Sequence, residues 1–262
     1  MEVWQAILLG AVQGFAEFLP ISSSGHLILM QRWLGVSEGT LFFDVMLHIG
    51  TLIPVFIIFF KDILGLFKKP FSKMLWLIIA TIPAALTGML LGDIVEGAFY
   101  AGNLLSAILL SITFIITAVE LFFAEKLAKK GYNNQPLKLT NAFFMGLGQS
   151  IAIVPGLSRS GTVICSGTFA KVNNEENASF AFLMSIPVIL GAAVVSGYKA
   201  IKGGVVIDAV PLIAGVLTAA ITGYIAIEFM LKIIKKANYK WFSLYLVIMA
   251  IASTVSMVAF GV

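Results

Sequence analysis

The stretch QGFAEFLPISSSGH, residues 13–26, decides how the rest of this chain can fold. It gathers polar and ionisable side chains in a sequence that is otherwise hydrophobic enough to lie in lipid. Because a carboxylate and an imidazole are costly inside a membrane, ionisable residues there indicate a functional site by default. The stretch is therefore the first candidate site. Its polar side chains are Gln13, Glu17, Ser22, Ser23, Ser24 and His26.

The composition is typical of an integral membrane protein. Of the 262 residues, 60% are hydrophobic and only 11% are charged, and the mean hydropathy is +1.01. A soluble domain carries about 25% charged residues. The net charge is +4, but the lysines lie in short clusters between apolar runs, so we expect no nucleic-acid partner. The single cysteine, Cys165, excludes an internal disulfide and a cysteine metal cluster.

The polar stretch interrupts a segment that is too short to cross a bilayer. Residues 3–16 are apolar, whereas a crossing needs about 20 residues. Pro20 disfavours helix at Leu19, and the three serines can cap a second short helix that reads HLILMQRWLG. Two half-length helices joined at such a break predict a re-entrant hairpin. Its non-helical backbone is tolerated only where it is buried in protein or lines a cavity.

Other apolar segments are long enough to cross the membrane. They are expected at about 41–60, 74–92, 103–123, 178–198, 207–231 and 241–261. Glu120 and Glu228 lie near the ends of two of them and are expected at the membrane interface. Residues 139–154 are again apolar and too short, and they lead into PGLSRSGT, residues 155–162. This second break predicts a second hairpin.

An internal repeat relates the two breaks. A shift of 136 residues places six of the seventeen positions from 10 to 26 on identical residues. Three crossings, an odd number, separate the two hairpins, so the second must enter from the opposite side. Inverted repeats with broken helices place their site near the bilayer midplane. The matched pairs are Gly10 with Gly146, Gln13 with Gln149, Ala16 with Ala152, Ser22 with Ser158, Ser24 with Ser160, and Gly25 with Gly161.

The expected fold is an all-α integral membrane protein with six transmembrane helices and two re-entrant hairpins in an inverted repeat. It forms a single polytopic domain, residues 1–262, with repeats at about 1–130 and 131–262. Lysine placement predicts the orientation, because one side holds thirteen basic residues and the other holds only Arg32, Lys199 and Lys202. By the positive-inside rule both termini and the first hairpin face the outer side.

The two breaks could together form a site for phosphate. Each presents a helix N-terminus, whose free N–H groups and dipole favour an anion. Arg159 adds a guanidinium that suits phosphate geometry, and at that depth it requires an anion or a carboxylate such as Glu17 as partner. The residues expected to bind the substrate phosphate are Gln13, Ser22, Ser24, Gly25, Ser158, Ser160, Gly161 and Thr162.

Two assignments of the chemistry are open from the residues alone. In one, Ser23 is the nucleophile, His26 carries the proton, and Glu17 orients His26 or binds a metal. In the other, His26 is itself the phosphate acceptor. Gln13, Glu17 and a diphosphate could also hold Mg²⁺ or Ca²⁺, which prefer oxygen ligands. Asp44 and His48, four apart on one helical face, either support this site or form a buried polar pair, and His48 is not expected to be a catalyst.

Three motifs indicate a resemblance to a known family, and this resemblance extends over nearly the whole chain. QGFAE matches an (E/Q)xxxE motif at Gln13 and Glu17, PISSSGH contains a Ser-Ser-Gly-His motif, and PGLSRSG begins a PGxSRSxxT motif. With these strings the chain resembles the undecaprenyl-diphosphatase family, also called the bacitracin-resistance proteins. One position departs, because the last threonine of the third motif falls on Val163, while Thr162 precedes it.

The resemblance implies hydrolysis of undecaprenyl diphosphate to undecaprenyl phosphate and inorganic phosphate. This reaction recycles the lipid carrier for cell-wall synthesis. The resemblance also implies help from a divalent cation and a site open to the outer face of the bacterial cell membrane. The family's catalytic positions fall on Glu17, Ser23, His26 and Arg159. The expected partners are the lipid substrate and the bilayer, and a homodimer is compatible with the sequence.

One other class of function remains. An inverted repeat around a midplane site is also transporter architecture, so the alternative is a transporter or flippase for a phosphorylated lipid or a small anion. Transport does not need a serine beside a carboxylate and an imidazole. A measurement of hydrolysis therefore separates the two classes.

Overall fold

The computed structural model describes residues 1–36, 40–203 and 208–261. Within these ranges the chain is helical apart from short connections and an isolated bridge between Gln135 and Val172. The helices are α1 (Val3–Phe18), α2 (Ser23–Trp33), α3 (Thr40–Ile58), α4 (Phe60–Leu66), α5 (Ser72–Phe99), α6 (Leu104–Lys129), α7 (Leu139–Ile151), α8 (Arg159–Phe169), α9 (Asn174–Leu183), α10 (Ser185–Gly203), α11 (Ala209–Lys236) and α12 (Lys240–Phe260).

In the described part of the chain, six helical segments are long and apolar enough to cross a membrane, which confirms the expected fold class. They are Leu41–Ile58, Ser72–Phe99, Leu104–Lys129, Asn174–Lys202, Ala209–Lys236 and Lys240–Ala259. Each overlaps one predicted crossing, but several run further than hydropathy indicated. The ends of these helices carry charged residues, which lower the local hydropathy although the backbone there is still helical. Hydropathy alone therefore placed these ends too early. The predicted start at 207 lies outside the described residues.

The fourth crossing is broken, which hydropathy did not reveal. α9 ends at Leu183, Met184 follows, and α10 begins at Ser185. Pro187 lies in the first turn of α10, and a proline has no N–H to donate to the carbonyl four residues earlier, here that of Leu183. The missing hydrogen bond falls at the junction and explains its position.

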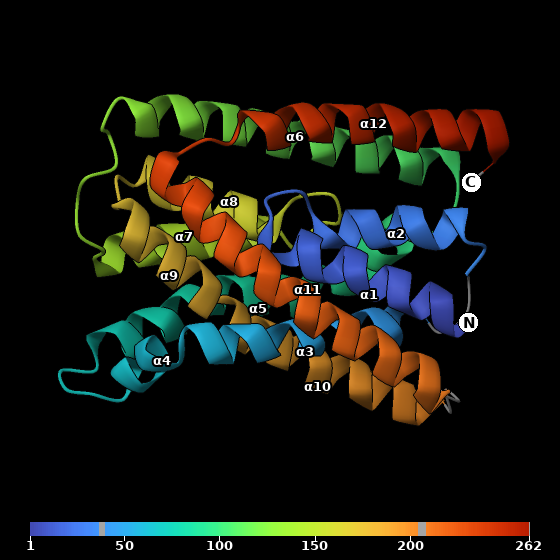
Figure 1. Cartoon of the computed structure of the whole chain (residues 1–262), viewed down its shortest axis with the longest axis horizontal. Helices are drawn as coiled ribbons and strands as arrows, with labels where there is room; N and C mark the ends of the chain where they lie inside the picture. The colour runs from blue at the N-terminus through green and yellow to red at the C-terminus, as the bar shows by residue number, and fades with distance from the viewer. Residues whose placement is uncertain (37–39, 204–207, 262) are drawn as a thin grey trace.

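Two helix–turn–helix pairs meet in the middle of the molecule. In Figure 1, α1 and α2 come from the end that holds both chain termini, whereas α7 and α8 come from the other end. The turns at residues 19–22 and 152–158 therefore face each other. The entry of these pairs into the bilayer from opposite sides stays a prediction.

Helix boundaries recur at the offset found in the sequence. α2 spans residues 23–33 and α8 spans residues 159–169, so both ends of the two helices are 136 residues apart. α6 begins at Leu104 and α12 at Lys240, which gives the same difference. The packing recurs as well, because α1 packs on α11 and α7 packs on α5. These matches agree with the division of the chain near residue 130, which stays a prediction.

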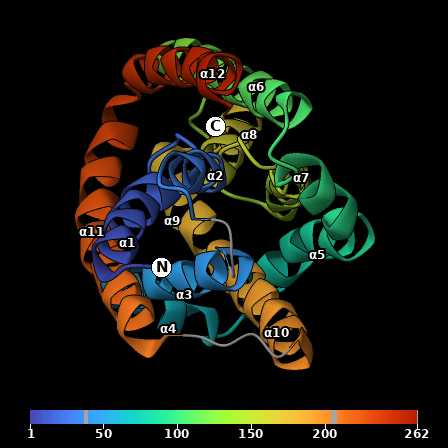
Figure 2. The same ribbon diagram turned by 90° about the vertical axis from the view of Figure 1, so that its right-hand side faces the viewer.

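Glycines allow the half-length helices to approach their neighbours closely. A Cβ on Gly10 of α1 would overlap the carbonyl oxygen of Gly215 on α11. A Cβ on Gly146 of α7 would likewise overlap the carbonyl oxygen of Ala80 on α5. Figure 2 looks along the helices and shows α5, α6, α11 and α12 around the outside, with α2, α8 and α9 inside. The site is thus enclosed by the longer helices.

Candidate active site

The two turns are built in the same way. Ser22 caps α2, where its Oγ accepts a hydrogen bond from Gly25 N at 3.3 Å. Ser158 caps α8, where its Oγ accepts from Gly161 N at 3.1 Å. Each cap satisfies a free N–H of the first helical turn. The four residues occupy equivalent places in the repeat.

Turn 2, residues 152–158, is held by α6. Thr117 Oγ1 accepts a hydrogen bond from Ser158 N at 3.1 Å and lies 3.4 Å from Gly156 O, to which it donates. Gly156 has a φ of +87°, and a Cβ there would also overlap Thr113 Oγ1. Only glycine fits this position, which explains the glycine of the motif.

Further serine contacts join the two turns. Ser22 and Ser24 have their Oγ atoms 3.5 Å apart, and Ser158 and Ser160 have theirs 3.3 Å apart. Ser160 Oγ also donates to Leu19 O of turn 1, residues 19–22, at 3.2 Å. A Cβ on Gly161 would lie 3.1 Å from Pro20 Cβ. The predicted meeting of the two breaks is therefore seen in the structure.

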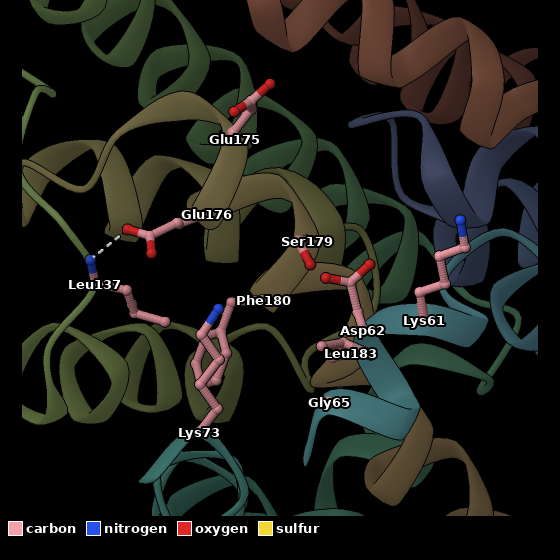
Figure 3. Close-up of a pocket in the computed structure, with 10 residues that line it drawn as sticks. All are labelled: Lys61, Asp62, Gly65, Lys73, Leu137, Glu175, Glu176, Ser179, Phe180 and Leu183. Carbon is pink, nitrogen blue, oxygen red and sulfur yellow. Dashed lines mark hydrogen bonds between the residues drawn. The ribbon is translucent and has the colours of Figure 1, made fainter. Parts of the chain in front are cut away.

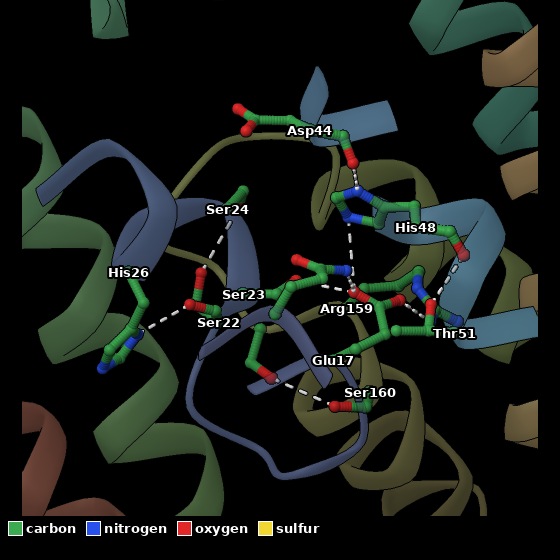
Figure 4. Close-up of polar contacts among 12 residues, drawn as sticks. Glu17, Ser22, Ser23, Ser24, His26, Asp44, His48, Thr51, Arg159 and Ser160 are labelled. Atoms are coloured by element: carbon green, nitrogen blue, oxygen red, sulfur yellow. Dashed lines mark hydrogen bonds and ion pairs between the residues drawn. The ribbon is translucent and has the colours of Figure 1, made fainter. Parts of the chain in front are cut away.

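Glu17 is the centre of the polar contacts (Figure 4). Its side chain is buried, with a residue exposure of 4%. Ser23 Oγ donates to Glu17 Oε2 at 2.6 Å, and Gln13 Nε2 donates to the same oxygen at 3.0 Å. Arg159 donates through an Nη to Glu17 Oε1 and forms an ion pair with it. Four of the predicted site residues are thus brought together.

His48 also contacts Glu17, a specific contact that the sequence did not identify. Its Nε2 lies 3.3 Å from Glu17 Oε2, and its Nδ1 lies 2.7 Å from the carbonyl oxygen of Asp44. A carbonyl oxygen only accepts, so Nδ1 carries a hydrogen and donates it. The pairing of Asp44 and His48 four residues apart was the available signal. It did not indicate which of the two would face the site.

Asp44 itself points elsewhere. Its Oδ1 accepts a hydrogen bond from Gln31 Nε2 of α2 at 2.5 Å. Asp44 and His48 therefore tie α3 to hairpin 1, the α1–α2 pair, at two places, one through Gln31 and one through Glu17. The sequence left two alternatives for Asp44 and His48, support of the site or a buried polar pair. The contact of His48 with Glu17 corresponds to the first.

His26 lies apart from the Glu17 cluster (Figure 4). Its Nδ1 is 2.8 Å from Ser22 O, and its Nε2 is 2.7 Å from the hydroxyl of Tyr245 on α12. Both ring nitrogens therefore have partners other than Ser23 and Glu17. The orientation of His26 by Glu17, one of the roles considered for this carboxylate, is not the arrangement in this structure.

Thr162, the residue before Val163, has its hydrogen-bond partner on α6. Its Oγ1 donates to Glu120 Oε2 at 2.7 Å. Glu120 was expected at the membrane interface because hydropathy ended its helix at 123. α6 runs to Lys129, so Glu120 lies inside the helix and contacts α8. The charged last turns of α6 explain why hydropathy ended the helix too early, and the place of Glu120 at the membrane interface stays a prediction.

Gln13 and Glu17 fit a hard cation in part. Gln13 Oε1 is buried and has no hydrogen-bond partner among the described residues, so a second oxygen ligand is available beside the carboxylate. Ca²⁺ takes about six to eight oxygens and Mg²⁺ six. No group of three or more His, Cys, Asp or Glu side chains suited to a metal occurs in the described residues. Most ligands of such a cation would therefore come from a bound diphosphate and water.

A separate cavity of about 520 Å³ lies between α4, the start of α5 and α9 (Figure 3). Its walls mix both signs of charge, and Glu176 there accepts a hydrogen bond from Leu137 N at 2.7 Å. None of the predicted site residues lines it, so it is distinct from the cluster around Glu17. The charged and polar lining residues are Lys61, Asp62, Lys73, Glu175, Glu176 and Ser179.

Comparisons with known proteins show the family of the chain. The family described as Bacitracin resistance protein BacA matches residues 6–252. An undecaprenyl-diphosphatase of Carboxydothermus hydrogenoformans is 42% identical over 255 residues, which cover 96% of each chain. One of Caldicellulosiruptor bescii is 41% identical over 253 residues and 94% of each chain. One of Thermodesulfovibrio yellowstonii is 39% identical over 250 residues, 92% of this chain and 94% of the relative.

Both the length of the match and the level of identity are well above what a shared fold alone produces. The match also includes both turns and every residue placed around Glu17. The chain belongs to the Bacitracin resistance protein BacA family.

Proposed function

We propose that this protein hydrolyses undecaprenyl diphosphate to undecaprenyl phosphate and inorganic phosphate, and so recycles the lipid carrier for cell-wall synthesis. The relatives at about 40% identity are named for this activity. The observation that carries the proposal is the contact of Ser23 and Arg159 with one buried carboxylate, Glu17. That contact forms where two helix N-termini face each other.

The geometry gives each residue a role. Ser23 and Arg159 are the first residues of α2 and α8, so the terminal phosphate can bind between two helix N-termini and the guanidinium. Ser23 already donates its hydroxyl hydrogen to Glu17, which can accept that proton as Oγ attacks the terminal phosphorus. The bond from phosphorus to the bridging oxygen then breaks and undecaprenyl phosphate leaves. Water then attacks the phosphorus of the phosphoserine, the bond from phosphorus to Ser23 Oγ breaks, and Glu17 returns the proton to Oγ as inorganic phosphate is released.

A second route through His26 has less support from the contacts. Neither ring nitrogen of His26 is turned to Glu17, and Nε2 faces Tyr245. An attack by His26 would first require that the hydrogen bond from Tyr245 be released. Ser23 needs no such rearrangement.

A divalent cation, Mg²⁺ or Ca²⁺, is part of this proposal. Gln13 Oε1 and Glu17 would hold it together with the diphosphate oxygens, and when bound it would neutralise charge on the phosphates. The residues of the chain supply the remaining positive charge through Arg159. The residues that bind the substrate are thus proposed to be the same whether or not the cation is bound.

The placement in the membrane is also proposed. Helices of the length and hydropathy found here make a multi-pass membrane protein. The lysine-rich connections lie at the end of the molecule opposite both termini (Figure 1). By the positive-inside rule this supports a placement in which both termini, hairpin 1 and the opening of the site face the outer side of the cell membrane. A homodimer stays a prediction of the sequence.

The test is phosphate release from undecaprenyl diphosphate by purified protein in detergent, with and without Mg²⁺ or Ca²⁺. We expect turnover in the parent and in Ser196→Ala, a serine on α10 outside the site, and loss of turnover in Ser23→Ala. Trapping of the phosphoenzyme assigns the nucleophile. Label on Ser23 supports the first route, label on His26 supports the second, and normal turnover in the Ser23→Ala, His26→Ala double variant rules out both.

Transport remains the second candidate, because the paired turns from opposite ends are also found in transporters. Liposomes containing the protein would then move a phosphorylated lipid across the bilayer without hydrolysis. Hydrolysis that stops in Ser23→Ala while movement continues would show that one fold supports both activities.

A further inference from the structure

The imidazole of His26 is held by a residue far away in the sequence. Tyr245 lies on α12, 219 positions beyond His26, and its hydroxyl oxygen is 2.7 Å from His26 Nε2. The two rings are stacked, with centroids 5.5 Å apart and planes 11° apart. Phe114 of α6 packs edge-on against the same imidazole, at 5.6 Å between centroids. The ring is therefore fixed by α6 and α12 together.

The hydrogen-bond partners determine which nitrogen carries the hydrogen. Ser22 O, 2.8 Å from His26 Nδ1, can only accept, so Nδ1 donates to it. In the neutral ring Nε2 then has a lone pair, and the hydroxyl of Tyr245 donates to that lone pair. The contacts thus select one tautomer and turn its basic nitrogen toward α12.

The second hairpin is attached in a related way. Thr162 occupies the place in α8 that His26 occupies in α2, since the two positions are 136 residues apart. Thr162 donates to Glu120 of α6. Each short helix therefore anchors to the α6–α12 pair through the residue at this place. In hairpin 1 that anchoring residue is also one of the predicted catalytic residues.

We propose that Tyr245 is the positioning residue of His26. It holds the imidazole as the Nδ1–H tautomer, with Nε2 bound to the Tyr245 hydroxyl. Through the His26 bond to Ser22 O it also fixes the backbone next to Ser23. The proposal rests on the proposed function for its effect on catalysis, but not for its effect on the imidazole.

The first experiment observes the imidazole directly. The chain has only two histidines, so NMR of the full protein labelled with ¹⁵N-histidine gives two ring systems, and His48→Gln assigns them. We expect His26 to carry its hydrogen on Nδ1. In Tyr245→Phe, which keeps the aromatic ring, we expect the Nε2 resonance to move toward the value of a free lone pair. Tyr198 is an exposed tyrosine on α10, so Tyr198→Phe is the control and should leave the ring resonances of both histidines unchanged.

The second experiment measures turnover. Tyr245→Phe is expected to lower kcat by roughly three- to tenfold with little change in KM, because the variant loses one hydrogen bond that orients the site. An Nε2–H tautomer in the parent overturns the proposal, and so does an unchanged Nε2 resonance in Tyr245→Phe. A shifted resonance with unchanged kcat overturns the catalytic part alone. A parent protein without hydrolysis contradicts the proposed function, while the NMR result still decides the position of His26.

Discussion

Arg159 of α8 donates a hydrogen bond to Glu17 of α1, joining two residues that are 142 positions apart. The pair closes the contact between the two turns, and both side chains are largely shielded from solvent. Loss of one partner from a buried ion pair leaves an uncompensated charge. The pair is therefore expected to matter both for the fold and for the substrate.

The first prediction concerns this pair. Arg159→Gln should abolish measurable turnover and lower the free energy of unfolding by about 3–5 kcal/mol, since Glu17 then lacks its cation. Lys199→Gln is the matched control, because Lys199 pairs with Asp93 and both are exposed, at 49% and 88%. It should change stability by less than about 1 kcal/mol. Thermal unfolding in detergent measures the stability of both variants, and an equal loss of stability in the two would contradict the prediction.

The second prediction concerns His48. Because its Nε2 lies 3.3 Å from the Glu17 oxygen that accepts from Ser23, this polar contact of the imidazole helps to orient the carboxylate. His48→Ala should lower kcat by about ten- to a hundredfold, the range for a lost polar contact to a charged group. His48→Gln retains an amide donor and should retain more activity. Equal activity of His48→Ala and the parent would show that this contact has no role in turnover.

Much of this arrangement could be predicted from the sequence, for a physical reason. The breaks at Pro20 and Pro155 and the serine caps are local signals, and the 136-residue repeat relates the two turns without any knowledge of packing. The meeting of Arg159 with Glu17 follows from these signals. The contact of Thr162 with Glu120 does not, because hydropathy ended α6 too early.

The partners of the histidines could not be predicted in this way. The contact of His26 with Tyr245 depends on how α12 is rotated about its axis. A helix that is apolar on most sides has no amphipathic pattern that would define this rotation. For the same reason the sequence placed Asp44 and His48 on one face of α3 but could not predict that they contact Gln31 and Glu17.

The third prediction concerns the glycine contacts of the half-length helices. Gly10→Ala and Gly146→Ala should each lower the melting temperature, because the added Cβ overlaps a carbonyl oxygen of α11 or α5 that cannot move without its helix. Gly92→Ala in α5 is the control, since nothing lies within 4 Å of its Cβ position. It should stabilise the helix by about 0.5–1 kcal/mol. Similar melting temperatures for Gly10→Ala and Gly92→Ala would show that α1 and α11 are further apart.

The last prediction concerns the contact of Thr162 with Glu120. Thr162→Val preserves the shape of the side chain but removes the donor, so the half-buried carboxylate loses its partner. We expect a loss of about 1–3 kcal/mol in the free energy of unfolding. In Glu120→Leu the acceptor is absent, so the same threonine substitution should then have little effect. The double-variant cycle should therefore give a coupling of about 0.5–3 kcal/mol. Glu228, which is exposed on α11, supplies the control cycle with Thr162, and additive effects are expected there. Additive effects in the Glu120 cycle as well would mean that α8 is held to α6 mainly by the Thr117 contacts.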